Sequence, residues 1–236
     1  MTASAEMRTH RCVSAAAAVV CTLAVGAVCW GLLAHRPAVV LGAFSTDLSA
    51  RTARQMANIR RAVCLLNGAV VPPGGEFSFN ARVGPCTAAQ GFVPAPTIVA
   101  GELTETPGGG VCQVSSTLYN AVLLSGLQIV ERHPHSRPPL SVPPGRDAAV
   151  FAPNLDLRFQ NNTNSKIVVQ ASISANRLIC RIVGASKPKE SFSLAVETAK
   201  ARRSGKPALV ARLWRIKYVR GTEFAREMIS EDVYRM

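Results

Sequence analysis

The chain has 236 residues, of which 48% are hydrophobic and 17% are charged. This composition excludes a disordered chain and the length excludes a large multidomain assembly, so we expect one sizeable domain with at most a small appendage. The formal net charge of +13 is spread along the chain without a dense basic run. Charge alone fits nucleic acid and an anionic cell envelope equally well. We predict the envelope, no nucleic-acid partner and no cofactor.

An apolar segment near the N-terminus comes first. Val13–Ala34 contains 22 residues without a charge, and as a helix it would span ~33 Å, enough for a bilayer core. Arg8 and Arg11 precede it, which favours a cytoplasmic N-terminus and an exported body. The apolar region of a signal peptide is usually shorter, about 7–15 residues. We therefore predict a single-pass membrane anchor over residues 1–36, with a cleaved signal as the alternative.

The rest of the chain divides into three parts. Residues 37–47 are predicted to be a linker, residues 48–186 the main domain, and residues 187–236 a basic C-terminal extension. In the main domain we expect a helix capped by Ser49 and ending at Leu66, where Asn-Gly follows. The stretch over residues 80–110 is rich in Gly, Pro and Thr, and such long irregular stretches are usually functional.

A second helix is expected to begin at Val111 and to end at Gly126. Alternating or β-branched runs predict strands at residues 127–132, 148–151, 155–159, 167–173 and 178–183. Two further alternating runs, over residues 208–218 and 223–229, predict a C-terminal β-hairpin. The expected fold class is α+β, a mixed single domain in which the second helix packs on antiparallel strands.

The strongest chemical signal is Cys112, which follows three glycines at the predicted start of the second helix. Glycine lets a substrate approach the backbone closely. The first N–H groups of a helix have no intrahelical partner, so they stabilise a thiolate and can bind an oxyanion. We predict that Cys112 is a nucleophile. The alternative is a buried cysteine that packs as a small apolar side chain after a glycine turn.

Two histidines follow at a distance that can return them to Cys112. A helix over residues 112–125 would be ~20 Å long, and an extended chain from Leu127 to His133 or His135 covers ~20–26 Å in return. Both histidines would face the same side of that chain. In thiol catalysis an imidazole accepts the thiol proton and later protonates the leaving amine. The alternatives are two surface histidines, or a metal site of both with Cys112; we assign no metal ligand.

A third group should orient the imidazole. Asp147 is our candidate, with Glu131 and Asp156 as alternatives. Arg146 can bind a substrate carboxylate, or can form a loop salt bridge with Asp147. Around the thiol, we expect five residues to line the substrate or the oxyanion site: Gly109, Gly110, Gln113, Ser115 and Ser116.

The same residues resemble a known family. Segments of the chain over roughly residues 45–185 are similar to the VanW-like family, chiefly Gly108–Asn120, Glu131–Ser136 and Val142–Asp147, with Pro73–Asn80 and Val83–Gly84 upstream. The family is named from a vancomycin-resistance cluster of bacteria. Some members with this domain are implicated as cysteine L,D-transpeptidases that crosslink peptidoglycan.

The resemblance implies Cys112 as nucleophile and His135, in a His-Ser pair, as base; His133 is less typical of the family. This chain lacks the peptidoglycan-binding repeats that often precede the domain. It also has three extra thiols in the body, and an exported domain can form disulfides. A disulfide among these thiols therefore stays open: Cys64, Cys86 and Cys180.

The expected function is that of a membrane-anchored cysteine acyltransferase on peptidoglycan stem peptides, with its body outside the bacterial membrane. With water as the acceptor the same site would be a carboxypeptidase or endopeptidase. The alternative is a non-catalytic protein that binds the cell wall or a glycopeptide, in which Cys112 is structural.

Overall fold

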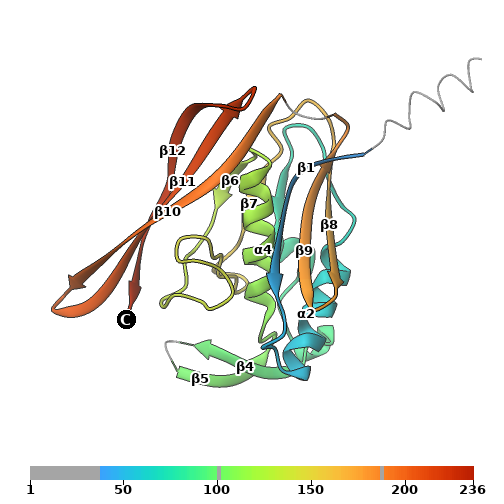
Figure 1. The fold of residues 1–236 in the computed structure, drawn as a ribbon. Helices are drawn as coiled ribbons and strands as arrows, with labels where there is room; N and C mark the ends of the chain where they lie inside the picture. Colours follow the sequence, from blue (N-terminus) through green and yellow to red (C-terminus); the bar gives the residue numbers. More distant parts are fainter. Residues whose placement is uncertain (1–37, 100–101, 187–188) are drawn as a thin grey trace, which may run out of the picture. The chain divides into compact units, whose positions relative to one another are not determined.

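A computed structural model describes residues 38–99, 102–186 and 189–236 of the chain (Figure 1). The predicted membrane segment Val13–Ala34 lies outside these residues. Within the described ranges, no helix has both the length and the apolar character needed to cross a membrane.

A four-stranded antiparallel sheet has the order β1–β9–β8–β2, with β1 over Val39–Asp47, β9 over Arg177–Gly184, β8 over Ile167–Ser174 and β2 over Ala69–Val71. The alternation expected for β8 and β9 is present, since Ile167, Val169 and Ala171 are buried. The linker prediction for residues 37–47 is wrong, because residues 39–47 pair with β9 along the edge of the sheet. The strand was missed because only two of its residues are fully buried.

Helices α2 (Ala53–Leu66) and α4 (Val111–Leu124) contact each other and the sheet, α2 through β8 and α4 through β1 and β9. The N-cap of α2 is Thr52 and not Ser49, because Thr52 and Gln55 form a reciprocal capping box. Ser49 instead binds the side chain of Asp47. Helix α4 is buried on nearly all sides because β6 and β10 contact it as well.

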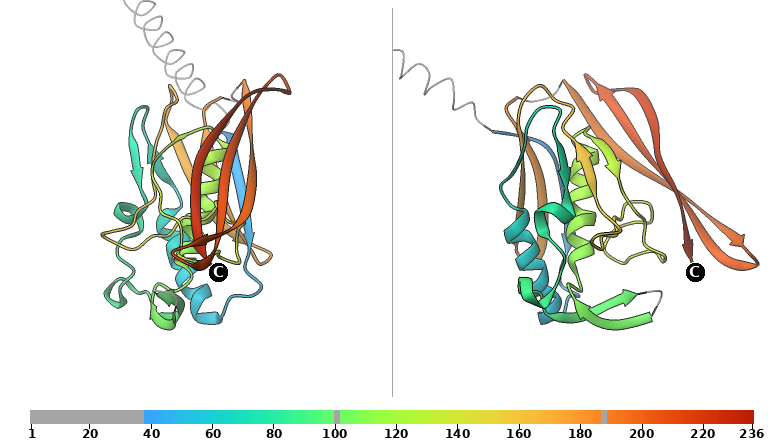
Figure 2. Two further views of the ribbon diagram at one scale, coloured as in Figure 1. Left: turned by 90° about the vertical axis from the view of Figure 1, so that its left-hand side faces the viewer. Right: turned by 180° about the vertical axis from the view of Figure 1, so that it is seen from behind.

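Smaller elements complete the main domain. The strands β3 (Glu76–Ser78), β7 (Arg158–Gln160) and β6 (Gln128–Glu131) form a second sheet. Residues 80–110 are less irregular than expected: they hold most of α3 (Phe79–Val83), η1 (Ala88–Gln90) and a hairpin of β4 (Pro94–Val99) and β5 (Glu102–Pro107). This hairpin lies at the end of the domain where α4 begins (Figures 1 and 2). The strand predicted over residues 148–151 is reduced to isolated bridges.

The C-terminal residues form a three-stranded antiparallel sheet of β10 (Glu190–Arg203), β11 (Lys206–Val219) and β12 (Thr222–Arg235). The predicted hairpin corresponds to β11 and β12, and β10 was not foreseen. The mixed α+β class is confirmed, with antiparallel strands throughout these sheets.

Candidate active site

The glycine segment shapes the start of α4. Gly110 is the N-cap residue with φ of 100°, a conformation that favours glycine. Gly109 is buried, and a Cβ atom there would lie 2.5 Å from the carbonyl oxygen of Ala95 in β4. Asn58 of α2 donates to the carbonyl oxygen of Gly109 at 3.1 Å. The glycines therefore allow a tight turn beside the β4–β5 hairpin, which places Cys112 in the first turn of α4.

The long loop between β6 and β7 returns to this end of the helix. The N–H group of Ala149 donates to the carbonyl oxygen of His133 at 2.8 Å. Two serines of α4 hold the same loop: Ser115 Oγ donates to Ala148 O at 2.7 Å, and Ala148 N donates to Ser116 Oγ at 3.0 Å. These bonds fix the loop residue Asp147 against the first two turns of α4.

Cys112, His135 and Asp147 form one chain of contacts. Nδ1 of His135 lies 2.6 Å from Oδ2 of Asp147, and the backbone N–H of His135 donates to the same oxygen at 2.7 Å. Because Nδ1 is engaged, Nε2 is the ring atom left to hydrogen-bond the thiol of Cys112. The thiol also lies 3.6 Å from the carbonyl oxygen of Val150. This order of carboxylate, imidazole and thiol is the one that acyl-transfer nucleophiles require.

The charges of the three groups support one another. Burial raises the pKa of the Cys112 thiol, but the hydrogen bond and positive charge of His135 outweigh burial, so the pKa lies below its ordinary value. Burial lowers the pKa of His135, while Asp147 and Cys112 raise it, with a net rise to about 9. The pKa of Asp147 lies below its ordinary value, because His135, Arg132 and Tyr234 outweigh the effect of burial. Both shifts favour the thiolate–imidazolium form of the pair over the neutral form.

Two residues that the sequence analysis did not single out, Arg132 and Tyr234, hold Asp147, and a third, Asp232, holds Arg132. Arg132 Nη2 donates to Asp147 Oδ1 at 3.0 Å, and Arg132 Nη1 donates to Asp232 Oδ2 at 2.6 Å. The hydroxyl of Tyr234 donates to Asp147 Oδ1 at 2.5 Å. Arg132 lies in a segment that carries the family resemblance, yet its sequence position does not show that its charge is buried. Asp232 and Tyr234 lie in β12, and no pattern along the chain links them to Asp147.

Two backbone amides remain for an oxyanion. Val111 N donates to Gly108 O at 3.0 Å, and Gln113 N donates to Gly110 O at 3.0 Å. Within the described ranges the N–H groups of Gly110 and Cys112 donate no backbone hydrogen bond. Of the residues expected to line the oxyanion site, Gly110 therefore keeps a free backbone N–H, whereas those of Gly109 and Gln113 are bonded. Cys112 supplies the second free N–H, at the positive end of the α4 dipole.

Three predicted substrate-lining side chains serve the fold. Gln113 is buried and donates to Thr46 Oγ1 at 2.9 Å and to Asp47 O at 2.7 Å, so it ties α4 to β1. Ser115 and Ser116 are also buried and bind the backbone of Cys112 and Ala148. They bind the backbone of α4 and of the loop that carries Asp147.

The other predicted residues make their hydrogen bonds with groups other than the Cys112 thiol. Arg146 donates to Asn120 Oδ1 at 2.6 Å and stacks over the Phe44 ring, so it forms no salt bridge with Asp147. His133 Nε2 lies 2.8 Å from Glu131 Oε1, so this ring nitrogen is bound to Glu131 and not to the Cys112 thiol. Glu131 and Asp156, the alternatives to Asp147, are bound elsewhere, since Asp156 accepts from the backbone N–H of Asn80 at 2.9 Å.

All four cysteines in the described part of the chain are free thiols: Cys64, Cys86, Cys112 and Cys180. Cys180 is fully buried in the core, and burial raises its pKa to about 12. Cys86 lies close enough to Cys112 for their charges to interact. Over residues 38–99, 102–186 and 189–236, no three His, Cys, Asp or Glu side chains are grouped as a metal site would require.

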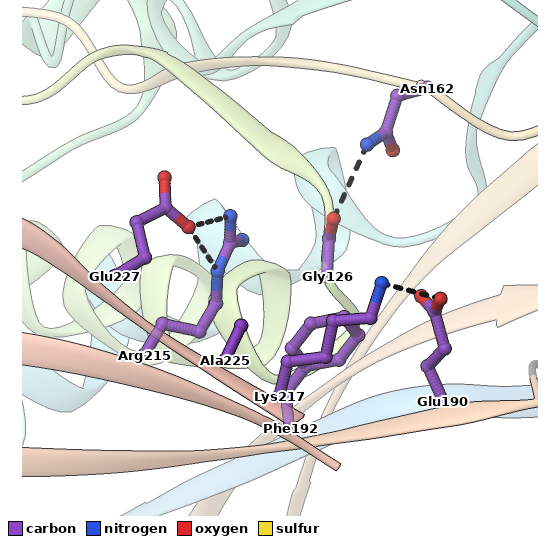
Figure 3. Close-up of a pocket in the computed structure, with 8 residues that line it drawn as sticks. All are labelled: Gly126, Asn162, Glu190, Phe192, Arg215, Lys217, Ala225 and Glu227. Atoms are coloured by element: carbon purple, nitrogen blue, oxygen red, sulfur yellow. Dashed lines mark hydrogen bonds and ion pairs between the residues drawn. The ribbon is translucent and has the colours of Figure 1, made fainter. Parts of the chain in front are cut away.

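A pocket of about 290 Å³ lies where the C-terminal sheet meets the main domain (Figure 3). Its charged side chains are paired: Arg215 with Glu227 at 2.8 Å, and Lys217 with Glu190 at 2.5 Å. On the main-domain side of the pocket, Asn162 donates to the carbonyl oxygen of Gly126 at 3.3 Å. This hollow is therefore part of the docking of the sheet, and it presents no unpaired charge to a ligand.

Comparison with known proteins identifies the family of the chain. The family model described as VanW like protein matches residues 54–183, which include Cys112, His135 and Asp147. The chain belongs to the VanW-like family. This confirms the resemblance seen in the glycine–cysteine and histidine segments.

Two relatives are similar to the chain over more than half of its length. The uncharacterized protein YoaR of Bacillus subtilis is 46% identical over 140 residues, which are 59% of this chain and 46% of YoaR. The vancomycin B-type resistance protein VanW of Enterococcus faecalis is 26% identical over 171 residues, which are 70% of this chain and 62% of that protein. The chain thus matches less than two thirds of the length of each relative. No solved structure matches it.

Proposed function

We propose that this VanW-like protein is a cysteine acyltransferase of the cell wall, of the L,D-transpeptidase type, acting on peptidoglycan stem peptides. The observation that carries the proposal is the Cys112–His135–Asp147 chain at the start of α4. The name of the Enterococcus faecalis relative, a vancomycin resistance protein, supports a cell-wall substrate.

In the first step the Cys112 thiolate attacks the carbonyl carbon of the L,D peptide bond in a donor tetrapeptide. A carbon–sulfur bond forms, and the charge that develops on the carbonyl oxygen is stabilised by the amides of Gly110 and Cys112. As the carbon–nitrogen bond breaks, the imidazolium of His135 protonates the leaving amine of the terminal D-residue. The product is a thioester on Cys112.

In the second step an amine of a neighbouring stem peptide attacks the thioester. His135, now neutral, accepts the proton of that amine, and the thiolate leaves. Asp147 keeps Nδ1 protonated and Nε2 directed at the reacting atoms in both steps. Water in place of the amine would make the same site a carboxypeptidase.

The proposal is tested by incubating the full chain with labelled muropeptides that carry a tetrapeptide stem. We expect release of the terminal D-residue and a thioester adduct on Cys112, detected by mass spectrometry. The Cys112→Ala variant should give neither. Release that continues unchanged in Cys112→Ala would exclude nucleophilic catalysis by this residue. Tight binding of muropeptide or glycopeptide without any release would favour the non-catalytic accessory protein.

We further propose that residues 13–34 anchor the chain in the bacterial membrane with residues 38–236 outside. Cys64 offers a direct measurement because it is an exposed free thiol on α2. A membrane-impermeant maleimide is expected to label Cys64 on intact cells, and Cys64→Ser should lose that label. Labelling of Cys64 only after lysis would show that the domain faces the cytoplasm.

A further inference from the structure

The C-terminal sheet is hydrogen-bonded to the loop that carries His135 and Asp147, and to the turn that follows α4. In β12 the N–H of Arg235 donates to the carbonyl oxygen of Ser136, the residue after His135, at 2.9 Å. In β11 Arg215 Nη1 donates to the carbonyl oxygen of Leu127 at 2.8 Å. All of β10–β12 lies beyond residues 54–183, the segment that the family model matches. Nothing in that match assigns this sheet a role.

Tyr234 fixes the orientation of the Asp147 carboxylate. Its side chain is fully buried, and its hydroxyl accepts from Gly145 N at 2.7 Å while donating to Asp147 Oδ1. Arg132 donates to the same oxygen. With Oδ1 occupied by these two donors, Oδ2 is the oxygen left for His135, where the ring and backbone nitrogens both reach it.

Asp232 determines the net charge of the buried cluster that holds the Asp147 carboxylate. Arg132 and Asp147 alone would form a neutral buried pair, because the guanidinium would offset the carboxylate. Asp232 is 6% exposed and accepts from Arg132 Nη1 through both oxygens, at 2.7 and 2.6 Å. The cluster of Arg132, Asp147 and Asp232 therefore carries one net negative charge. That charge is available to stabilise the imidazolium of His135.

We propose that Asp232 and Tyr234 of the C-terminal sheet are positioning residues of the Cys112 site, so that β12 completes the acid–base machinery that the family segment begins. This inference rests on the proposed function of Cys112 as a nucleophile. The groups that titrate at the site are Cys112 from α4, and His135 and Asp147 from the loop. Arg132, Asp232 and Tyr234 stand behind Asp147, and Cys86 lies near the thiol.

The test is the pH profile of Cys112 alkylation by iodoacetamide in the full chain, read by mass spectrometry of the Cys112 peptide. Asp232→Asn removes a negative charge that stands behind Asp147 and His135, so it lowers the pKa of His135 more than that of the thiol, and the proton that the two groups share moves toward the sulfur. We expect slower alkylation between the two inflections of the profile, by about tenfold for each unit by which the two pKa values draw together. Tyr234→Phe, which frees the carboxylate to rotate, should slow alkylation several-fold. Tyr218→Phe is the matched control, because its hydroxyl lies 3.3 Å from Ser193 Oγ on the same sheet; its profile should equal the wild type.

Unfolding midpoints are measured for every variant. A lower midpoint with a wild-type alkylation profile in Asp232→Asn and Tyr234→Phe would show a purely structural role and overturn the proposal. If Asp232→Asn does not fold, Tyr234→Phe decides alone. Shifted alkylation profiles together with no release from muropeptides would leave this inference standing and would overturn the proposed function.

Discussion

Replacing His135 with alanine is expected to remove most of the nucleophilic character of Cys112. Without the imidazolium, burial and the charge of Asp147 both raise the pKa of the thiol, and only the contact with Val150 still lowers it. The inflection of alkylation should rise above that of an ordinary thiol, and each unit is about tenfold in rate at pH 6–7. Acyl transfer should fall by a factor of about 10²–10⁴, the usual worth of a positioned acid–base group.

His133→Ala is the matched control, since it removes the same side chain two residues earlier, where the ring contacts Glu131. Its alkylation profile and turnover should remain close to the wild type. If His133→Ala were inactive and His135→Ala active, the base would be misassigned while the nucleophile would stand. A wild-type alkylation profile in His135→Ala would contradict the thiolate–imidazolium pair itself.

The upper end of the pH profile follows from His135. Its raised pKa keeps the ring protonated through neutral pH and lets it lose the proton as the pH rises through about 9. Below that value the ring can protonate a leaving amine, and above it the ring cannot. Thioester formation should therefore decline above pH 9 although the thiol stays ionised.

That His135 lies beside Cys112 could be predicted from the sequence, because the prediction needed only the rise of a helix and the length of the returning chain. A helix of known rise followed by a returning strand brought His135 level with Cys112, and the structure agrees. Asp147 followed from the need for a third group near the histidine loop. These residues lie within one stretch of chain, so spacing was informative.

Predictions failed where the deciding contact comes from far along the chain. β1 was taken for a linker because its pairing partner β9 follows more than a hundred residues later. Gln113 seemed placed for a substrate, yet Thr46 and Asp47 of β1 hold its side chain. The burial of Asp232 was not predicted for the same reason. A charged residue in an alternating strand normally faces solvent, and only the contact with the distant Arg132 explains why Asp232 is buried.

Replacing Arg132 with methionine is expected to be the most destabilising single change in the region of the site. Its side chain is only 5% exposed and is paired with both Asp147 and Asp232. Removing one partner from a buried ion pair typically costs about 3–5 kcal/mol of unfolding free energy, because a charge is left buried. Asp232 would keep only the Ser230 hydroxyl, at 3.1 Å. Urea unfolding monitored by circular dichroism measures the loss.

Two measurements distinguish the loss of charge pairing from the loss of packing. These are the pH dependence of the unfolding free energy and the stability of a double variant. A buried carboxylate without its partner has a raised pKa in the folded state, so the deficit of Arg132→Met should shrink from pH 8 to pH 5 as the group takes up a proton. Arg132→Met combined with Asp232→Asn should be more stable than the sum of the two single losses predicts. Arg212→Met is the control, because Arg212 forms an exposed ion pair with Glu231 in the C-terminal sheet. Its loss should change the free energy of unfolding very little. Strictly additive losses, independent of pH, would mean that Arg132 stabilises the domain through its packing over Tyr119 and not through its charge.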